Sequence, residues 1–103
     1  MARYTIEWSV DARVDLLDIL QFYIDRNGSS TYSRKINLNI NKIVNKLKSN
    51  PFLGIRTDYE SVRILHAGGF QIVYEILDQI VLIILIWDCR RNPEDRRIGN
   101  RVK

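Results

Sequence analysis

The densest group of chemically capable side chains lies in residues 88–103. This segment has six basic residues against three acidic ones, and so holds +3 of the chain's net charge of +4. Guanidinium groups bind phosphates and carboxylates through several hydrogen bonds at once. The composition therefore predicts a basic tail, residues 88–103, that binds a nucleic acid or an acidic protein. Its candidate binding residues are Arg90, Arg91, Arg96 and Arg97.

An ion pair within the basic tail is an equally strong interpretation for any one of these arginines. Glu94 and Asp95 lie directly before the second arginine pair. Exposed ion pairs of this kind are common and contribute little to stability. Under this interpretation the segment is a solvated terminus.

The other reactive side chains are few. His66 is the single histidine, which excludes a mechanism with paired histidines, and its place beside Gly68-Gly69 predicts a turn residue. Cys89 is the single cysteine, so we expect an inert thiol, no internal disulfide and no zinc cluster, as suits a reducing compartment. Four acids at helical spacings predict a solvated helix face rather than a metal site: Asp11, Asp15, Asp18 and Asp25.

The length and composition suit one compact unit. A chain of 103 residues that is 46% hydrophobic can form a single core, so we expect one domain over residues 1–103 that includes the basic tail. The longest apolar run, Ile80–Trp87, is far shorter than the roughly 20 residues of a membrane-spanning helix. The first residues do not resemble a secretory signal. We therefore expect a cytoplasmic protein without a membrane segment.

Two helices are predicted in the first half of the chain. Ser9 can cap a helix that ends at Asn27-Gly28, and Ser29 or Ser30 can cap a second helix that ends before Pro51. The short connection predicts that the two helices pack as a hairpin. The expected buried stripes are Val14, Leu17, Leu20 and Ile24 in the first helix, and Ile36, Ile40, Ile43 and Leu47 in the second.

The second half of the chain has the period of β-strands. Residues 3–8, 62–66 and 70–76 alternate between the two faces of a strand, and residues 80–87 are apolar throughout. The order predicts an α+β fold with an N-terminal strand, a two-helix hairpin and then a three-stranded antiparallel meander. Because the last strand lacks a polar face, both of its faces must be covered, and we expect a second protein to cover one of them.

Several short strings, in this order and spacing, resemble the RelE/ParE superfamily of bacterial toxins. The strings are Ile6-Glu7-Trp8-Ser9, Leu47-Lys48-Ser49-Asn50-Pro51, Val62-Arg63-Ile64-Leu65, Gly69-Phe70-Gln71-Ile72-Val73-Tyr74-Glu75-Ile76 and Asp88-Cys89-Arg90-Arg91-Asn92-Pro93. The resemblance covers nearly the whole chain. It implies the toxin of a type II toxin-antitoxin system, with two helices on a small antiparallel sheet, held inactive by a cognate antitoxin.

The resemblance implies one of two activities, because superfamily members either cut mRNA on the ribosome or poison DNA gyrase. The ribonucleases use clustered basic residues. An ungapped comparison places Val62 and Ile64 at the positions of their strand lysines, Gln71 at that of an arginine and Arg97 at that of a tyrosine. Only Arg91 matches, so the pattern is closer to the ParE branch.

We therefore expect a ParE-like toxin that inhibits growth by binding a nucleic-acid-handling target such as DNA gyrase through the arginines of the basic tail. One alternative is a metal-independent, ribosome-dependent mRNA endonuclease with Arg63 and Arg91 as catalytic residues. Another is an inactive toxin-like interaction module. No cofactor is implied. The expected partner is an acidic antitoxin that covers the apolar strand and meets the basic tail with its carboxylates.

Overall fold

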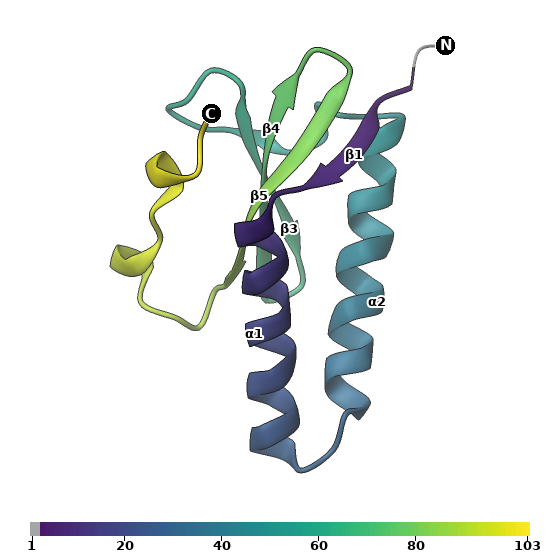
Figure 1. The fold of residues 1–103 in the computed structure, drawn as a ribbon, viewed down its shortest axis with the longest axis vertical. Helices are drawn as coiled ribbons and strands as arrows, with labels where there is room; N and C mark the ends of the chain where they lie inside the picture. The colour runs from purple at the N-terminus through teal and green to yellow at the C-terminus, as the bar shows by residue number, and fades with distance from the viewer. Residues whose placement is uncertain (1–2) are drawn as a thin grey trace.

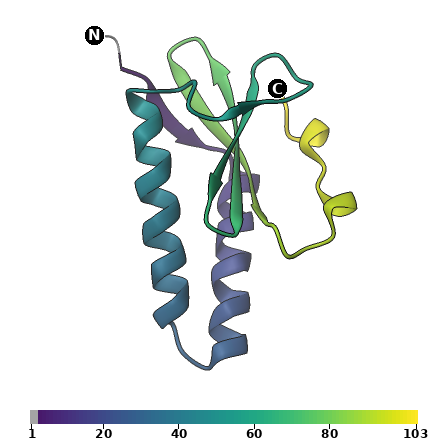
Figure 2. The ribbon, with the colours of Figure 1, turned by 180° about the vertical axis from the view of Figure 1, so that it is seen from behind.

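Two helices lie against one face of a five-stranded sheet, as Figures 1 and 2 show from opposite sides. The computed structural model describes residues 3–103. Helices α1 (Val10–Asn27) and α2 (Thr31–Asn45) form the predicted hairpin. The strand order is β1-β5-β4-β3-β2, with β1 (Thr5–Trp8), β2 (Ile55–Arg56), β3 (Val62–Ala67), β4 (Phe70–Leu77) and β5 (Ile80–Asp88). The predicted α+β fold is confirmed.

The sheet contains the predicted meander and two further strands. β3, β4 and β5 pair antiparallel in succession, with the turns where the sequence predicts them. β1 pairs parallel with β5 and forms one edge of the sheet. β2 forms the other edge by pairing antiparallel with β3, and this strand was not predicted. The prediction missed β2 because two residues are too short to produce an alternating pattern.

The ends of α1 follow the sequence signals. The Ser9 hydroxyl accepts a hydrogen bond from the Ala12 N–H at 3.0 Å, which satisfies one free donor of the first turn. Gly28 adopts the left-handed conformation with φ of 70°, and its N–H donates to the Ile24 carbonyl at 2.9 Å. A glycine reaches this conformation without a steric penalty, so α1 ends there.

The buried face of α1 differs from the prediction. Val14 and Leu17 are 47% and 65% exposed, whereas Ala12, Ile19 and Tyr23 form the buried face. Of the predicted stripe, Leu20 packs partly buried against this core. Apolar residues occur on both sides of this helix, so their spacing alone permits two orientations. The stripe predicted for the second helix is confirmed, since Ile36 and Ile40 of α2 are buried and Ile43 packs partly buried against them. Leu47 is buried as well, but in the 3-10 turn Lys46–Lys48 that follows α2.

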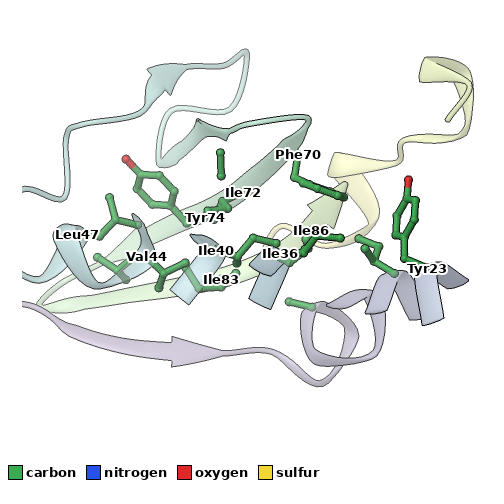
Figure 3. Packing of buried hydrophobic residues seen from close by; sticks show 14 residues of the cluster. Tyr23, Ile36, Ile40, Val44, Leu47, Phe70, Ile72, Tyr74, Ile83 and Ile86 are labelled. Carbon is green, nitrogen blue, oxygen red and sulfur yellow. The ribbon is translucent and has the colours of Figure 1, made fainter. Parts of the chain in front are cut away.

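The helix face of the sheet, which is the face that α1 and α2 cover, carries the larger core (Figure 3). Tyr74 is fully buried there. Its hydroxyl accepts a hydrogen bond from the Gly54 N–H at 2.8 Å and donates one to the Pro51 carbonyl at 2.7 Å. One phenol therefore attaches the irregular segment after α2 to the core of the sheet.

The opposite face of the sheet, which we call the tail face, is covered by the chain itself. Buried side chains of β3, β4 and β5 form a second core there, and Ile98 and Val102 of the basic tail pack against it. The Lys103 N–H also donates to a carboxylate oxygen of buried Glu75 at 2.9 Å. The expectation that a second protein covers this face of β5 is therefore wrong, because two apolar side chains within a charged segment provide the cover.

Close packing at Gly54 predicts that Gly54→Ala destabilises the fold. A β-carbon at this position would lie 2.7 Å from the Tyr74 hydroxyl and 2.9 Å from the Ile64 carbonyl oxygen. We expect a loss of about 1–3 kcal/mol, measured by urea denaturation. Gly69→Ala is the matched control, since nothing lies within 4 Å of the added carbon. Equal stability of the two variants would contradict this packing.

Candidate functional site

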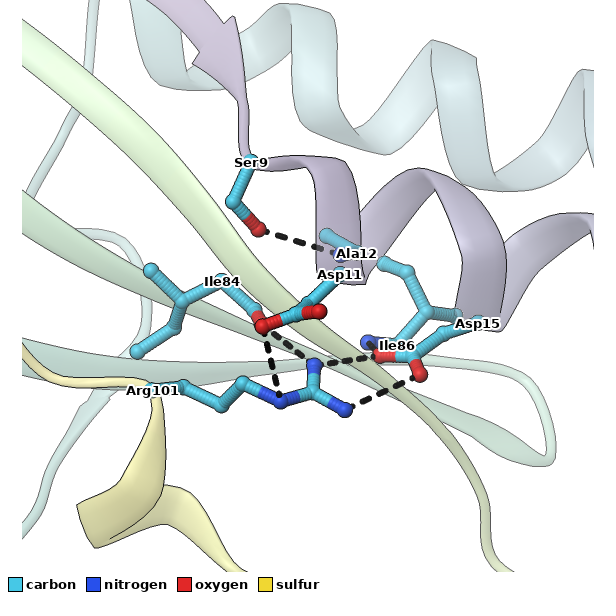
Figure 4. A network of polar contacts seen from close by, with 7 residues as sticks. All are labelled: Ser9, Asp11, Ala12, Asp15, Ile84, Ile86 and Arg101. Carbon is cyan, nitrogen blue, oxygen red and sulfur yellow. Dashed lines mark hydrogen bonds and ion pairs between the residues drawn. The ribbon is translucent and has the colours of Figure 1, made fainter.

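Arg101 attaches the basic tail to both α1 and β5 (Figure 4). Its guanidinium donates to both carboxylate oxygens of Asp15, at 2.8 and 3.2 Å, and to the Ile84 carbonyl at 2.8 Å. Asp11 lies 3.7 Å away as a second ion-pair partner. Asp15 also accepts the Ile86 N–H at 3.1 Å, so it is a structural group and not the solvated acid that its helical spacing predicted.

Arg90 lies at the end of β5 between a carboxylate and two aromatic rings. Its Nε donates to Asp88 at 3.1 Å, and its guanidinium lies 4.6 Å from the ring centroid of Tyr23 and 5.7 Å from that of Phe70. The Tyr23 hydroxyl donates to the other oxygen of Asp88 at 2.5 Å. These contacts hold Arg90 in one orientation while its side chain stays 53% exposed.

Burial and these hydrogen bonds shift the pKa values of both acids. Burial and the bond to Asp88 raise the pKa of Tyr23 to about 12. Burial alone would raise the pKa of Asp88, but the hydrogen bonds from Tyr23 and Arg90 outweigh it and lower that pKa below its ordinary value of 3.8. At neutral pH the group is therefore an Asp88 carboxylate held by a neutral phenol and a guanidinium.

The other arginines of the basic tail are held to different extents on the tail face. Arg91 is exposed and lies 4.7 Å above the ring of buried Trp87. Arg96 donates to the side-chain carbonyl of Gln71, whose amide nitrogen lies 3.3 Å from His66 Nε2. Because Gln71 pairs with Trp87 across β4 and β5, Arg91 and Arg96 lie over the same end of the sheet. Arg97, the next residue of the basic tail, is exposed.

Glu94 and Asp95 do not neutralise this group. The ion pairs found within residues 3–103 join Arg90 to Asp88, and Arg101 to Asp11 and Asp15. Arg90 is therefore paired inside the basic tail, but to Asp88 and not to Glu94 or Asp95, and within the described residues no ion pair is found for Arg91, Arg96 or Arg97.

The two arginines suggested as a ribonuclease pair lie on opposite faces of the sheet. Arg63 pairs with Tyr74 on the helix face, where it donates to the Gly54 carbonyl at 2.8 Å and lies over the ring of Phe52. Arg91 lies over Trp87 on the tail face. The structure therefore does not bring Arg63 and Arg91 together around one phosphate.

Residues 3–103 were also compared with the requirements of a metal site and of a membrane-spanning helix. No three His, Cys, Asp or Glu side chains in that range gather so that they could hold a metal ion. Neither α1 nor α2 is long and apolar enough to cross a membrane.

Comparison with known proteins gives the family. The model of the ParE toxin of type II toxin-antitoxin systems, parDE, matches residues 6–93. The chain belongs to the ParE toxin family. A search among curated proteins found no match.

Solved toxin-antitoxin structures agree with this ParE fold. A chain of the chromosomal ParDE system from P. aeruginosa superposes with a TM-score of 0.74 at 21% identity, covering 85% of this chain and 98% of that one. A chain of the RelBE2 toxin-antitoxin complex from Mycobacterium tuberculosis gives 0.63 at 18% identity, covering 84% and 98%. At these identities the similarity shows the shared fold.

The contacts of Asp88 predict a pH-dependent effect of Asp88→Asn. At pH 7 we expect a loss of about 1–3 kcal/mol of stability, because the variant loses the charge that holds Arg90. The folded state lowers the pKa of Asp88, so the carboxylate's contribution is complete above 3.8 and is lost as the pH falls through the folded value. Urea denaturation should therefore show a smaller difference from the wild type at pH 3. Asp25→Asn, at an exposed carboxylate of α1, should change little, and a pH-independent loss in Asp88→Asn would contradict this role.

Proposed function

We propose that this ParE toxin binds its target through guanidinium groups at the end of β5, that the target is DNA gyrase, and that an acidic antitoxin neutralises the toxin. The observation that carries the proposal is that Arg90 and Arg91 are each held over an aromatic ring and still exposed. Fixed guanidinium groups bind a partner's carboxylates or phosphates with less loss of side-chain entropy. Arg96 and Arg97 continue the same charged surface.

Binding is favoured over RNA cleavage by the placement of the charged groups. Cleavage without a metal needs a base, an acid and cations around one phosphate. Here Arg63 and Arg91 lie on different faces, and His66 contacts an amide. Val62 and Ile64, at the positions of the superfamily's strand lysines, belong to the core that the basic tail covers. These features support a toxin that binds and does not cut.

The experiment that separates the two activities is induction of the chain alone in bacteria. A gyrase poison should cause DNA breaks and an SOS response before translation falls, whereas a ribonuclease should fragment mRNA first. The acidic protein encoded beside the toxin gene, when co-expressed, should restore growth. Rapid mRNA cleavage without an SOS response would contradict the proposed target, and the absence of any growth defect would favour an inactive interaction module.

Arg91→Ala should weaken gyrase inhibition without unfolding the protein. The exposed side chain contributes a charge to the proposed interface, so we expect about tenfold or more protein to be needed for half-inhibition of supercoiling in vitro. Its stability should stay within about 1 kcal/mol of the wild type, since the substitution removes little more than the stack on Trp87. Arg34→Ala, at an exposed arginine of α2, is the control and should inhibit like the wild type. Unchanged inhibition by Arg91→Ala would place the target elsewhere.

A further inference from the structure

An apolar stripe runs along the side of α1 that faces away from the sheet. Val10, Val14 and Leu17 are 77%, 47% and 65% exposed, and partly buried Ile24 continues the stripe. Exposed Gln21 is its single polar member. The five residues follow one another at steps of 4, 3, 4 and 3, which is the spacing of positions a and d in a coiled coil. We call this stripe the α1 seam.

The rest of the helix is already used within the chain. Ala12 and Ile19 are buried in the core of the sheet, and Asp15 holds Arg101. In the heptad that the α1 seam defines, Ala12 and Ile19 lie at position f and Asp15 at position b. These positions lie away from the partner in a coiled coil. α1 can therefore pack on its sheet and on a second helix at the same time.

The charges beside the α1 seam indicate which helix covers it. Arg13 lies at position g on one flank, whereas Asp11, Asp18 and Asp25 all lie at position e on the other. Neither Arg13 nor Asp18 makes an ion pair within the described residues. Arg13 comes five positions before Asp18, which is the offset at which g and e residues meet across a parallel pair of helices. The flanks of α1 therefore complement those of a second α1.

We propose that two copies of this chain associate through their α1 seams as a short, parallel, two-stranded coiled coil. Arg13 of each copy then meets Asp18 of the other, so the contact occurs twice about the two-fold axis. Val14 at position a with Leu17 at position d favours two strands, and a polar side chain at an a position, here Gln21, fixes the register. An antiparallel pair would instead set the two aspartate flanks against each other.

The parallel arrangement determines how the pair presents its basic residues. The two-fold axis runs along α1, so the same end of both copies faces the same direction. Arg90 and Arg91 line a cavity with Phe22 and Arg26, near the C-terminal end of α1. The pair therefore carries two groups of tail arginines at one end, and a partner with two equivalent sites would bind both. Self-association goes beyond the proposed function and does not depend on it.

Sedimentation velocity of the full chain over a concentration series tests the self-association. The α1 seam is far shorter than a standard interface, so we expect a reversible dimer with a Kd on the order of 10–100 μM. Leu17→Asp should raise this Kd about tenfold or more. Leu38→Asp is the matched control, because Leu38 is also exposed, at 71%, but lies on α2. A chain that stays monomeric far above this range, or equal effects of the two substitutions, would overturn the proposal.

Charge reversal tests the predicted ion pair between the copies. Arg13→Asp and Asp18→Arg should each weaken dimerisation, because each sets like charges against one another across the seam. The double variant should recover most of the wild-type Kd, since the exchanged charges attract again. Both side chains are exposed, so the fold should tolerate all three variants. A double variant as weak as the single ones would overturn the parallel register.

Cross-linking tests the orientation directly. In a parallel pair identical seam residues face each other, so Val14→Cys should form a disulfide between two copies on mild oxidation. The exposed native thiol is removed by Cys89→Ser in this experiment, and Leu38→Cys is the control that should not cross-link. A dimer in which Val14→Cys does not cross-link would overturn the parallel arrangement. A monomeric chain whose Leu17→Asp variant loses affinity for the protein encoded beside its gene would assign the α1 seam to that protein instead.

Discussion

The constraint on which the structure depends is the exclusion of water from both faces of β5. Seven of its residues in succession, 81–87, are buried apolar side chains, so neither face can be left open. α1 and α2 cover the helix face, and the basic tail covers the other with Ile98 and Val102. Arg101 holds that cover in place through Asp15. The segment between β5 and Arg101 must therefore cross the end of the sheet, and this path gives Arg90, Arg91 and Arg96 their positions.

Local patterns in the sequence were sufficient for most of the fold. Caps, turns and alternation predicted the helix ends and β3 to β5, because these depend on neighbouring residues. The buried face of α1 was partly mispredicted because that helix carries apolar residues on two sides. Tertiary contacts, such as the hydrogen bond from Tyr23 to Asp88, lie on the side that is buried, and the local sequence does not reveal them. The contact of Asp15 with Arg101 spans 86 positions and follows no periodic signal. The arginines of the candidate site were predicted, but their aromatic supports were not.

The apolar side chains of the tail face include two positions, Val62 and Ile64, that bear on whether the chain could cleave RNA. An ungapped comparison sets Val62 and Ile64 against the strand lysines of the superfamily's ribonucleases, and both belong to the core beneath the basic tail. Two lysines there would place charges under Ile98 and Val102, at a high desolvation cost. Apolar side chains at these two positions instead suit a core on which Ile98 and Val102 of the basic tail pack. Membership of the ParE family agrees with this arrangement.

The position of Trp87 gives the chain an optical reporter. The chain has two tryptophans, and Trp87 is buried beneath the guanidinium of Arg91, whereas Trp8 lies in the edge strand β1. A nearby cation alters the emission of an indole ring, so the fluorescence of Trp87 depends on where Arg91 stands. With Trp8 replaced by phenylalanine, one unlabelled spectrum would reveal when a ligand draws Arg91 away from its ring.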